Sequence, residues 1–208
     1  MEDPEFTPIV LKRSDIGDVA SFITRNLDTY PFPGKYIKDP ESRYNISRSL
    51  WKAEIERLFE DGNLLASDTD FNCIGMYSTI GGLRSDSMDF GDYVDPLKEM
   101  ASGDRRRAHK ALSGIGKGID SLKLPPGTMD IYVVCSSSSV DEIAYCSCMV
   151  QHLIGIADSK GTDLFVCTVM KAMVRLYEAN GFKTLKVLDD QENDIKSWYM
   201  IHKCTVKE

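Results

Sequence analysis

The chain has 208 residues, of which 42% are hydrophobic and 27% are charged, and its formal net charge is −7. This length fits one domain with a hydrophobic core, and no stretch is long and apolar enough to predict a membrane span. The negative charge argues against a dedicated nucleic-acid-binding protein, which usually presents a basic face. The acidic start, MEDPEFTPIV, lacks the basic and apolar regions of a secretory signal. We therefore expect a cytoplasmic protein that binds neither nucleic acid nor membrane.

The six cysteines predict reduced thiols, not a disulfide framework. Most stand inside apolar runs such as YVVCS and LFVCTV, which is typical of buried thiols. Cys146 and Cys148 form a CxC pair on an expected helix, and no pair of His or Cys residues has zinc-finger spacing. We therefore expect no metal site.

The N-terminal part predicts a strand followed by two helices. Residues 7–13 form the expected strand, and the first helix follows over 15–28, with a cap at its start. The segment 29–42 predicts a loop, because its three prolines and one glycine interrupt any regular pattern. Residues 45–61 predict an amphipathic helix that Gly62 ends.

The middle of the chain predicts an antiparallel strand pair followed by an insertion. Residues 63–68 and 71–80 form the pair, joined by a short polar turn. Residues 82–127 are polar, have too few large apolar residues for a core of their own, and predict one helix over about 96–119. We therefore expect one domain, 1–208, that carries 82–127 as an insertion.

The C-terminal part predicts a βαβαββ pattern. Its two apolar runs, MDIYVVCS and TDLFVCTV, are continuous enough for central strands. The expected elements are a strand over 129–136, a loop and helix ending at Gly161, a strand over 162–169, a helix over 170–180 and two paired final strands.

The unit over 129–169 predicts parallel strands with a crossing helix. Backbone N–H groups at the start of that helix are free to bind an anion such as a phosphate. Small residues at Ala144, Cys146 and Ser147 would let a ligand approach the turn. Most helices in such units bind nothing there, so the pattern alone does not assign a ligand.

The motif LYEANGF, residues 176–182, ends the next helix and leads into a strand. Gly181 suits the left-handed turn between them. Tyr177 lies late on the helix, where its hydroxyl can face the gap between the parallel strands and donate a proton to a leaving thiolate. The alternative is a tyrosine that packs at the edge of the core.

The order of elements and LYEANGF together resemble the GNAT superfamily, the acyl-CoA-dependent N-acyltransferases. LYEANGF is similar to the family's LYxxxGF signature, whose tyrosine commonly acts as general acid. The βα segment aligns without a gap, and the insertion resembles those of fungal members. The resemblance implies an α/β (α+β) fold with a mixed central sheet of about six to seven strands flanked by helices, and with a helical insertion between strands 3 and 4.

The resemblance also implies a site for acetyl-CoA as co-substrate and a small-molecule amine as acceptor. Tyr177 would be the catalytic acid. The residues that would bind the co-substrate are Val134, Cys135 and Ser136 along the strand and Glu142, Ile143, Ala144, Tyr145, Cys146 and Ser147 at the turn. The family's loop pattern Q/R-x-x-G-x-G/A departs here: Asp141 and Glu142 begin it, and both glycines are replaced. Met170 stands where the family often has Asn.

Three residues are candidate bases for the acceptor amine: Asp130, Glu142 and His202. Each is also explained by a surface or structural role. The helix that carries Trp51 and the loop with Tyr30, Phe32 and Tyr36 would wall the acceptor site or pack as a hydrophobic lid.

The sequence therefore predicts an N-acetyltransferase that acts by direct attack of the amine on the thioester. A second hypothesis stands beside it: a protein with this fold that no longer uses acetyl-CoA, and that serves as a binding protein or catalyses another reaction on a small metabolite. Asp141, Glu142 and Met170 motivate the second hypothesis. A homodimer that pairs sheet edges is left open.

Overall fold

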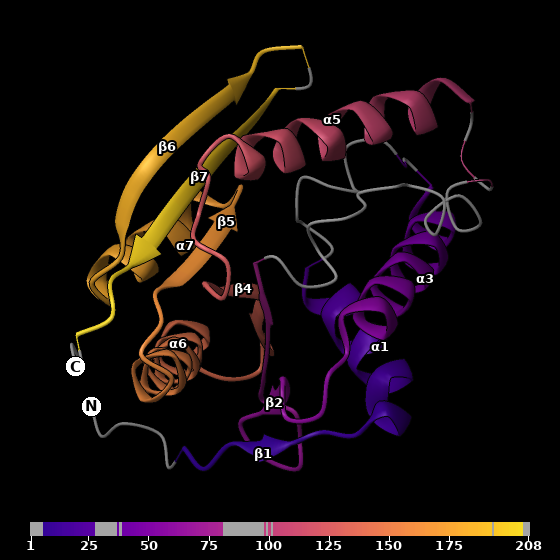
Figure 1. Cartoon of the computed structure of the whole chain (residues 1–208). Coiled ribbons are helices and arrows are strands. Elements are labelled where there is room, and N and C mark those ends of the chain that lie inside the picture. The colour runs from indigo at the N-terminus through magenta and orange to yellow at the C-terminus, as the bar shows by residue number, and fades with distance from the viewer. Residues whose placement is uncertain are drawn as a thin grey trace.

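The computed structural model describes residues 6–27, 37, 39–80, 98, 100, 102–192 and 194–205. Its strands form one mixed sheet of seven strands in the order β1-β2-β3-β4-β5-β7-β6 (Figure 1). All neighbours pair antiparallel except β4 and β5, which are parallel. The predicted fold class and the predicted order of helices and strands along the chain are confirmed. The strands are β1 (Ile9–Val10), β2 (Leu64–Ala66), β3 (Cys73–Thr79), β4 (Met129–Ser136), β5 (Leu164–Thr168), β6 (Lys183–Asp190) and β7 (Ile195–His202).

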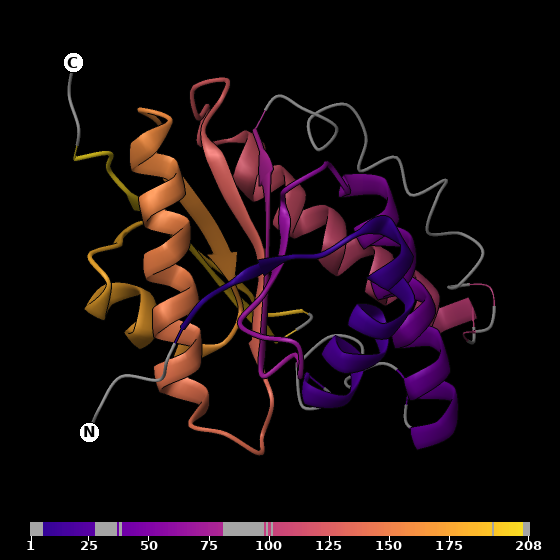
Figure 2. The same cartoon turned by 90° about the horizontal axis from the view of Figure 1, so that it is seen from below.

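Helices cover both faces of the sheet. The helices α6 and α7 pack on one face, and α1, α3 and α5 lie on the other (Figures 1 and 2). Val134 of β4 belongs to the apolar cluster below α6 and α7, and Val133 and Cys135 to the one below α1 and α3, because successive side chains of a strand point to opposite sides. The helices are α1 (Ile16–Asn26), preceded by a 3₁₀ turn (Arg13–Asp15), α3 (Pro40–Leu58), α5 (Ser102–Asp120), α6 (Glu142–Ser159) and α7 (Lys171–Ala179).

Two N-terminal predictions need correction. The first strand is only Ile9–Val10, not 7–13, because the 3₁₀ turn already begins at Arg13. The helix predicted over 45–61 begins at Pro40, inside the segment predicted as a loop. Asp39 accounts for the earlier start, since its carboxylate accepts a hydrogen bond from the Ser42 N–H at 2.8 Å and Pro40 needs no N–H partner at the first helical position.

The insertion contributes the helix α5, which packs on β6 and β7. It begins at Ser102, later than the predicted start at about residue 96, and residues 81–97 lie outside the described part of the chain. Among the described residues, no helix combines the length and the apolar character that a membrane crossing needs.

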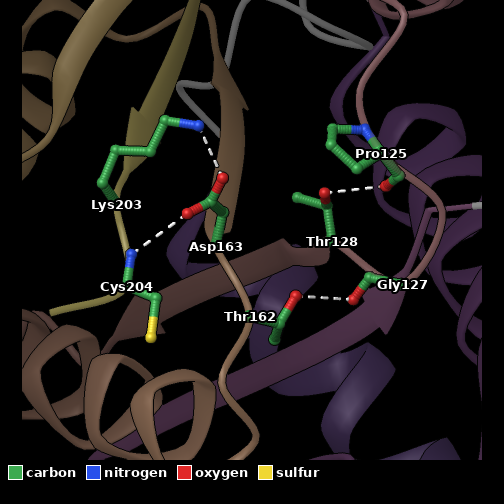
Figure 3. Close-up of polar contacts among 7 residues, drawn as sticks. All are labelled: Pro125, Gly127, Thr128, Thr162, Asp163, Lys203 and Cys204. Carbon is green, nitrogen blue, oxygen red and sulfur yellow. Dashed lines mark hydrogen bonds and ion pairs between the residues drawn. The ribbon is translucent and has the colours of Figure 1, made fainter. Parts of the chain in front are cut away.

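The amino ends of β4 and β5 are held together by polar contacts (Figure 3). The Thr162 hydroxyl donates to the Gly127 carbonyl at 2.8 Å, which links the turns before the two strands. The Asp163 carboxylate pairs with Lys203 at 2.6 Å and accepts from the Cys204 N–H at 3.1 Å. The Asp163 contacts also attach the segment that follows β7 to the start of β5, so β4, β5 and the end of β7 are held together at this edge of the sheet.

Candidate active site

The two parallel strands part towards their carboxyl ends. Within the described strands, β4 pairs with β5 only from Met129 opposite Leu164 to Ile131 opposite Val166. Beyond that point β4 continues to Ser136 and β5 to Thr168. An irregularity in the β3–β4 register at Tyr132 coincides with the separation, since Met76 pairs with Val133 and Tyr77 with Ile131. The sheet therefore opens at the end predicted to hold the ligand.

The backbone of β4 presents polar groups to this opening. The Ser137 N–H donates to the Asn72 carbonyl at 2.9 Å, on the β3 side. Backbone groups alternate along an antiparallel pair, so those of Cys135 also point to β3, and those of Val134 and Ser136 point to the side that β5 has left. The backbone groups of Val134 and Ser136 are thus directed away from β3, whereas the Cys135 thiol lies in the core below α1 and α3.

The start of α6 is capped by the residue that replaces the family's first loop position. Asp141 is the N-cap, and its Oδ1 accepts a hydrogen bond from the Ala144 N–H at 3.1 Å. Its carbonyl accepts from the Tyr145 N–H at 3.0 Å. The carboxylate therefore points at the helix terminus, where the predicted phosphate would bind.

The Asp141 cap reduces the number of backbone N–H groups that the start of α6 can donate to a phosphate. Because α6 begins at Glu142, the N–H groups of Cys146 and Ser147 lie inside the helical hydrogen-bond pattern. With the Ala144 N–H on Asp141, the donors at the terminus are those of Glu142 and Ile143. The side chain of Ile143 is 74% exposed and that of Cys146 is buried below the helix. The six residues from Glu142 to Ser147 thus all lie at the start of α6, but only Glu142 and Ile143 have backbone N–H groups available to a ligand.

Tyr177 is buried between α7 and the sheet, with 3% of its surface exposed. Its ring lies 5.2 Å from that of Phe182, measured between centroids, and the Phe182 N–H donates to the Tyr177 carbonyl at 3.0 Å. Gly181 has the expected left-handed conformation, with φ of 85°. Tyr177 belongs to the same large apolar cluster as Val134 and Cys146, on the face of the sheet that α6 and α7 cover.

Asn180 joins α7 to α6, a role that sequence reasoning missed. Its Nδ2 donates to the Ser147 hydroxyl at 3.1 Å and to the Leu176 carbonyl at 2.9 Å. Asn180 is the C-cap of α7, and Ser147 lies in the second turn of α6. The signal was present in LYEANGF, where an Asn before Gly often ends a helix. Met170, at the other end of α7, is the N-cap and makes no capping hydrogen bond with its side chain.

The three candidate bases are far from equivalent. Asp130 has no exposed surface and, as the register partner of Phe165, faces the α5 side of the sheet beside the point where the strands part. Glu142 is exposed at the first position of α6. His202, on β7, packs its ring 5.5 Å from that of Phe182.

The predicted acceptor wall is described in part. Trp51 of α3 meets Tyr132 edge to face at 6.2 Å between ring centroids, next to the opening of the strands. The loop with Tyr30, Phe32 and Tyr36 lies outside the described residues. In the described ranges no group of three or more His, Cys, Asp or Glu side chains is arranged to hold a metal ion.

Comparison with solved structures gives full-length matches at low identity. A protein from Corynebacterium glutamicum, described as histone acetyltransferase and related acetyltransferase, matches with TM-score 0.65 and 15% identity, over 97% of this chain and 98% of its own. A mosquito arylalkylamine N-acetyltransferase matches with TM-score 0.62 and 12% identity, over 95% and 99%. The C-terminal condensation domain of Ebony, solved with beta-alanyl-dopamine, matches with TM-score 0.64 and 11% identity, over 95% and 98%. No protein-family model and no curated sequence matches the chain.

Proposed function

Because the chain has the fold of the GNAT superfamily, we propose that it is an N-acetyltransferase that moves an acetyl group from acetyl-CoA to the amine of a small molecule. The observation that carries this proposal is the parting of β4 from β5, where the backbone groups of Val134 and Ser136 point away from β3 and the start of α6 follows the end of β4. The hydrogen bond between Asn180 and Ser147 holds the end of α7, the helix that carries Tyr177, against α6. An extended amide chain fits such a gap, since it can hydrogen-bond to a strand edge as another strand does.

Two parts of the co-substrate, the pantetheine arm and the pyrophosphate, have candidate groups to bind them. The backbone groups of Val134 and Ser136 suit the amides of the pantetheine arm. The N–H groups of Glu142 and Ile143 suit the pyrophosphate, because the positive end of a helix dipole favours an anion. The carboxylates of Asp141 and Glu142 oppose that anion, so we expect weaker binding than a glycine turn would give.

The reaction we propose is direct transfer. The neutral amine attacks the carbonyl carbon of the thioester, and the C–S bond breaks as the new C–N bond is completed. The Tyr177 hydroxyl donates its proton to the departing thiolate. Of the three candidate bases, Glu142 lies at the turn that would hold the pyrophosphate, whereas Asp130 lies on β4 where the two strands part, so we assign Asp130 the proton that the attacking amine loses.

The acceptor side supports a small amine with an apolar part. The Trp51–Tyr132 pair gives that side an aromatic wall, and the arylalkylamine N-acetyltransferase of mosquito has the same fold. We therefore propose to screen arylalkylamines and aliphatic amines side by side.

The test is calorimetric titration of the purified chain with acetyl-CoA and with CoA. We expect saturable binding near one ligand per chain, followed by amine-dependent release of CoA. Absence of binding at millimolar ligand would remove the acetyltransferase proposal and leave the fold.

A second function is favoured by the Asp141 carboxylate on the Ala144 N–H. In this alternative the fold binds another small metabolite, or joins two metabolites without acetyl-CoA, and Tyr177 is a packing residue. A condensation domain with the same fold is consistent with such a use. The CoA titration discriminates the two, because only the first function requires CoA to bind.

A further inference from the structure

The Met149 side chain of α6 packs directly on Gly75 of β3. A Cβ atom at this position would lie 2.5 Å from the Met149 sulfur and 2.7 Å from its Cγ. Any side chain other than hydrogen would therefore force the helix or Met149 to move. The glycine leaves the space that the Met149 side chain fills between this strand and this helix.

Two cysteines, Cys73 on β3 and Cys146 on α6, precede Gly75 and Met149 and lie on the same facing sides of the strand and the helix. Cys73 lies two residues before Gly75, on the same face of β3, and Cys146 lies three residues before Met149, on the same face of α6. Both are in the apolar cluster below α6, with 0% and 5% of their surfaces exposed. The Cys146 thiol contacts the Ser136 hydroxyl at 3.3 Å, and Ser136 is the register partner of Cys73.

The two thiols have opposite acid–base character. Hydrogen bonding with the Cys73 thiol lowers the pKa of Cys146, and the Ser136 hydroxyl adds to this effect against the opposing influence of burial. Hydrogen bonding with Cys146 and burial raise the pKa of Cys73 well above its usual value. Cys146 also has the contact with the Ser136 hydroxyl and the larger exposed fraction of the two, so we assign it the first reaction with the oxidant and Cys73 the second.

We propose that Cys73 and Cys146 are a redox pair that forms a reversible disulfide between β3 and α6 when a hydroperoxide is the oxidant. The Cys146 thiolate attacks one peroxide oxygen, the O–O bond breaks, and a sulfenic acid and water result. The Cys73 sulfur then attacks the sulfenic sulfur, the S–O bond breaks, and a second water leaves. Two thiols and one hydrogen peroxide thus give one disulfide and two waters, and a dithiol reverses the reaction by exchange.

The disulfide would act on the site described above, and this part rests on the proposed function. An S–S bond is about 2.05 Å long, shorter than any contact between two thiols, so closing it draws Cys146 and the start of α6 towards β3. The Glu142 and Ile143 N–H groups belong to that segment. We therefore expect the oxidised protein to bind CoA about tenfold more weakly than the reduced protein.

The experiment treats the full chain with hydrogen peroxide, blocks the remaining thiols and maps the peptides without reduction. We expect a Cys73–Cys146 linked peptide that dithiothreitol removes. In Cys73→Ala the sulfenic acid at Cys146 should instead be trapped by dimedone. Cys148→Ser is the matched control on the same helix, and the linked peptide should form in it as in the wild type.

A further variant tests the geometry without touching a thiol. Gly75→Ala should hold α6 away from β3 and lower the yield of linked peptide severalfold, while circular dichroism shows a folded chain. Oxidation of Cys148 and Cys204 without any Cys73–Cys146 link would overturn the proposal. If the disulfide forms but CoA affinity stays unchanged, the redox pair stands and its effect on CoA binding is overturned. If the reduced protein does not bind CoA at all, the proposed function is overturned instead.

Discussion

The Asp141 carboxylate and the Ala144 N–H are joined by a hydrogen bond of 3.1 Å across the first turn of α6. An aspartate in this position stabilises the helix, because it satisfies a backbone donor and places a negative charge at the positive end of the dipole. The same carboxylate competes with a phosphate for that donor. Asp141 therefore stabilises the helix and at the same time weakens the binding of an anion at its start.

Asp141→Asn should separate the two effects. Asparagine caps a helix about as well as aspartate, so the thermal stability should change little. Removal of the charge should strengthen acetyl-CoA binding by about fivefold, which corresponds to about 1 kcal/mol of relieved repulsion. Calorimetric titration measures the affinity and a thermal melt the stability.

The control for Asp141→Asn is Asp120→Asn, at the end of α5 that leads to the amino end of β4. It removes the same charge from the chain but not from the turn, so CoA affinity should stay as in the wild type. Equal affinities for the Asp141 variant and the wild type would show that the carboxylate does not meet the phosphate.

Tyr177→Phe tests the proton donor. The ring keeps its packing against Phe182, and only the hydroxyl is lost. We expect kcat to fall by about 10²-fold or more, the usual contribution of a general acid, with nearly unchanged CoA affinity. Steady-state kinetics and calorimetry on the same preparation give both values. Unchanged turnover would return Tyr177 to a packing role.

Much of this fold was predictable because local patterns and tertiary structure agree. The apolar runs at 129–136 and 162–169 gave central strands, and Gly161 and Gly181 have the positive φ that their helix ends require. The early start of α3 was missed because three prolines dominated the pattern, while Asp39 and Pro40 together form a cap.

The candidate site was less predictable, since it depends on relations across the sheet. The turn residues and Tyr177 were found as separate motifs, and their shared cluster follows from the packing of α6 and α7 on β4. The parting of β4 from β5 involves residues about 35 positions apart and has no local signal. The Asp141 carboxylate affects anion binding because it points at the start of α6. The sequence shows that this residue is charged, but not where its side chain points.

Two glycines of α5 should respond oppositely to alanine. A Cβ at Gly118 would lie 2.0 Å from the Tyr199 hydroxyl oxygen and 2.8 Å from a Leu188 methyl carbon. Tyr199 is fully buried and donates to the Ile115 carbonyl at 3.1 Å, so it has little freedom to move. Overpacking of this kind costs about 1–3 kcal/mol, more than the helix propensity that alanine gains. Gly118→Ala should therefore lower the free energy of unfolding.

Gly114→Ala is the matched control, one turn earlier on the same helix. Nothing lies within 4 Å of its added Cβ, so only the gain in helix propensity remains, up to about 1 kcal/mol. Urea unfolding of both variants measures whether the free energy of unfolding falls in Gly118→Ala and rises in Gly114→Ala. A stabilised Gly118→Ala variant would mean that α5 does not pack on β7 through this glycine.

The attachment of the chain after β7 should make the stability depend on acid pH. The Thr205 N–H and hydroxyl donate to Asp158 at 3.0 and 2.8 Å and lower the pKa of that carboxyl. Burial opposes the shift at Asp163, but the bonds from Lys203 and the Cys204 N–H outweigh it and lower its pKa as well.

Because the folded-state pKa of both carboxyls lies below the unfolded value, their contribution is fully present above about pH 5 and is lost as the pH falls through the folded values. The free energy of unfolding should therefore decrease from about pH 5 downwards. In the double variant Asp158→Asn/Asp163→Asn the decrease should be smaller, and the stability at pH 7 lower, than in the wild type. Urea unfolding between pH 3 and pH 7 tests this, and parallel profiles for the two proteins would mean that these carboxylates do not attach the terminal segment in solution.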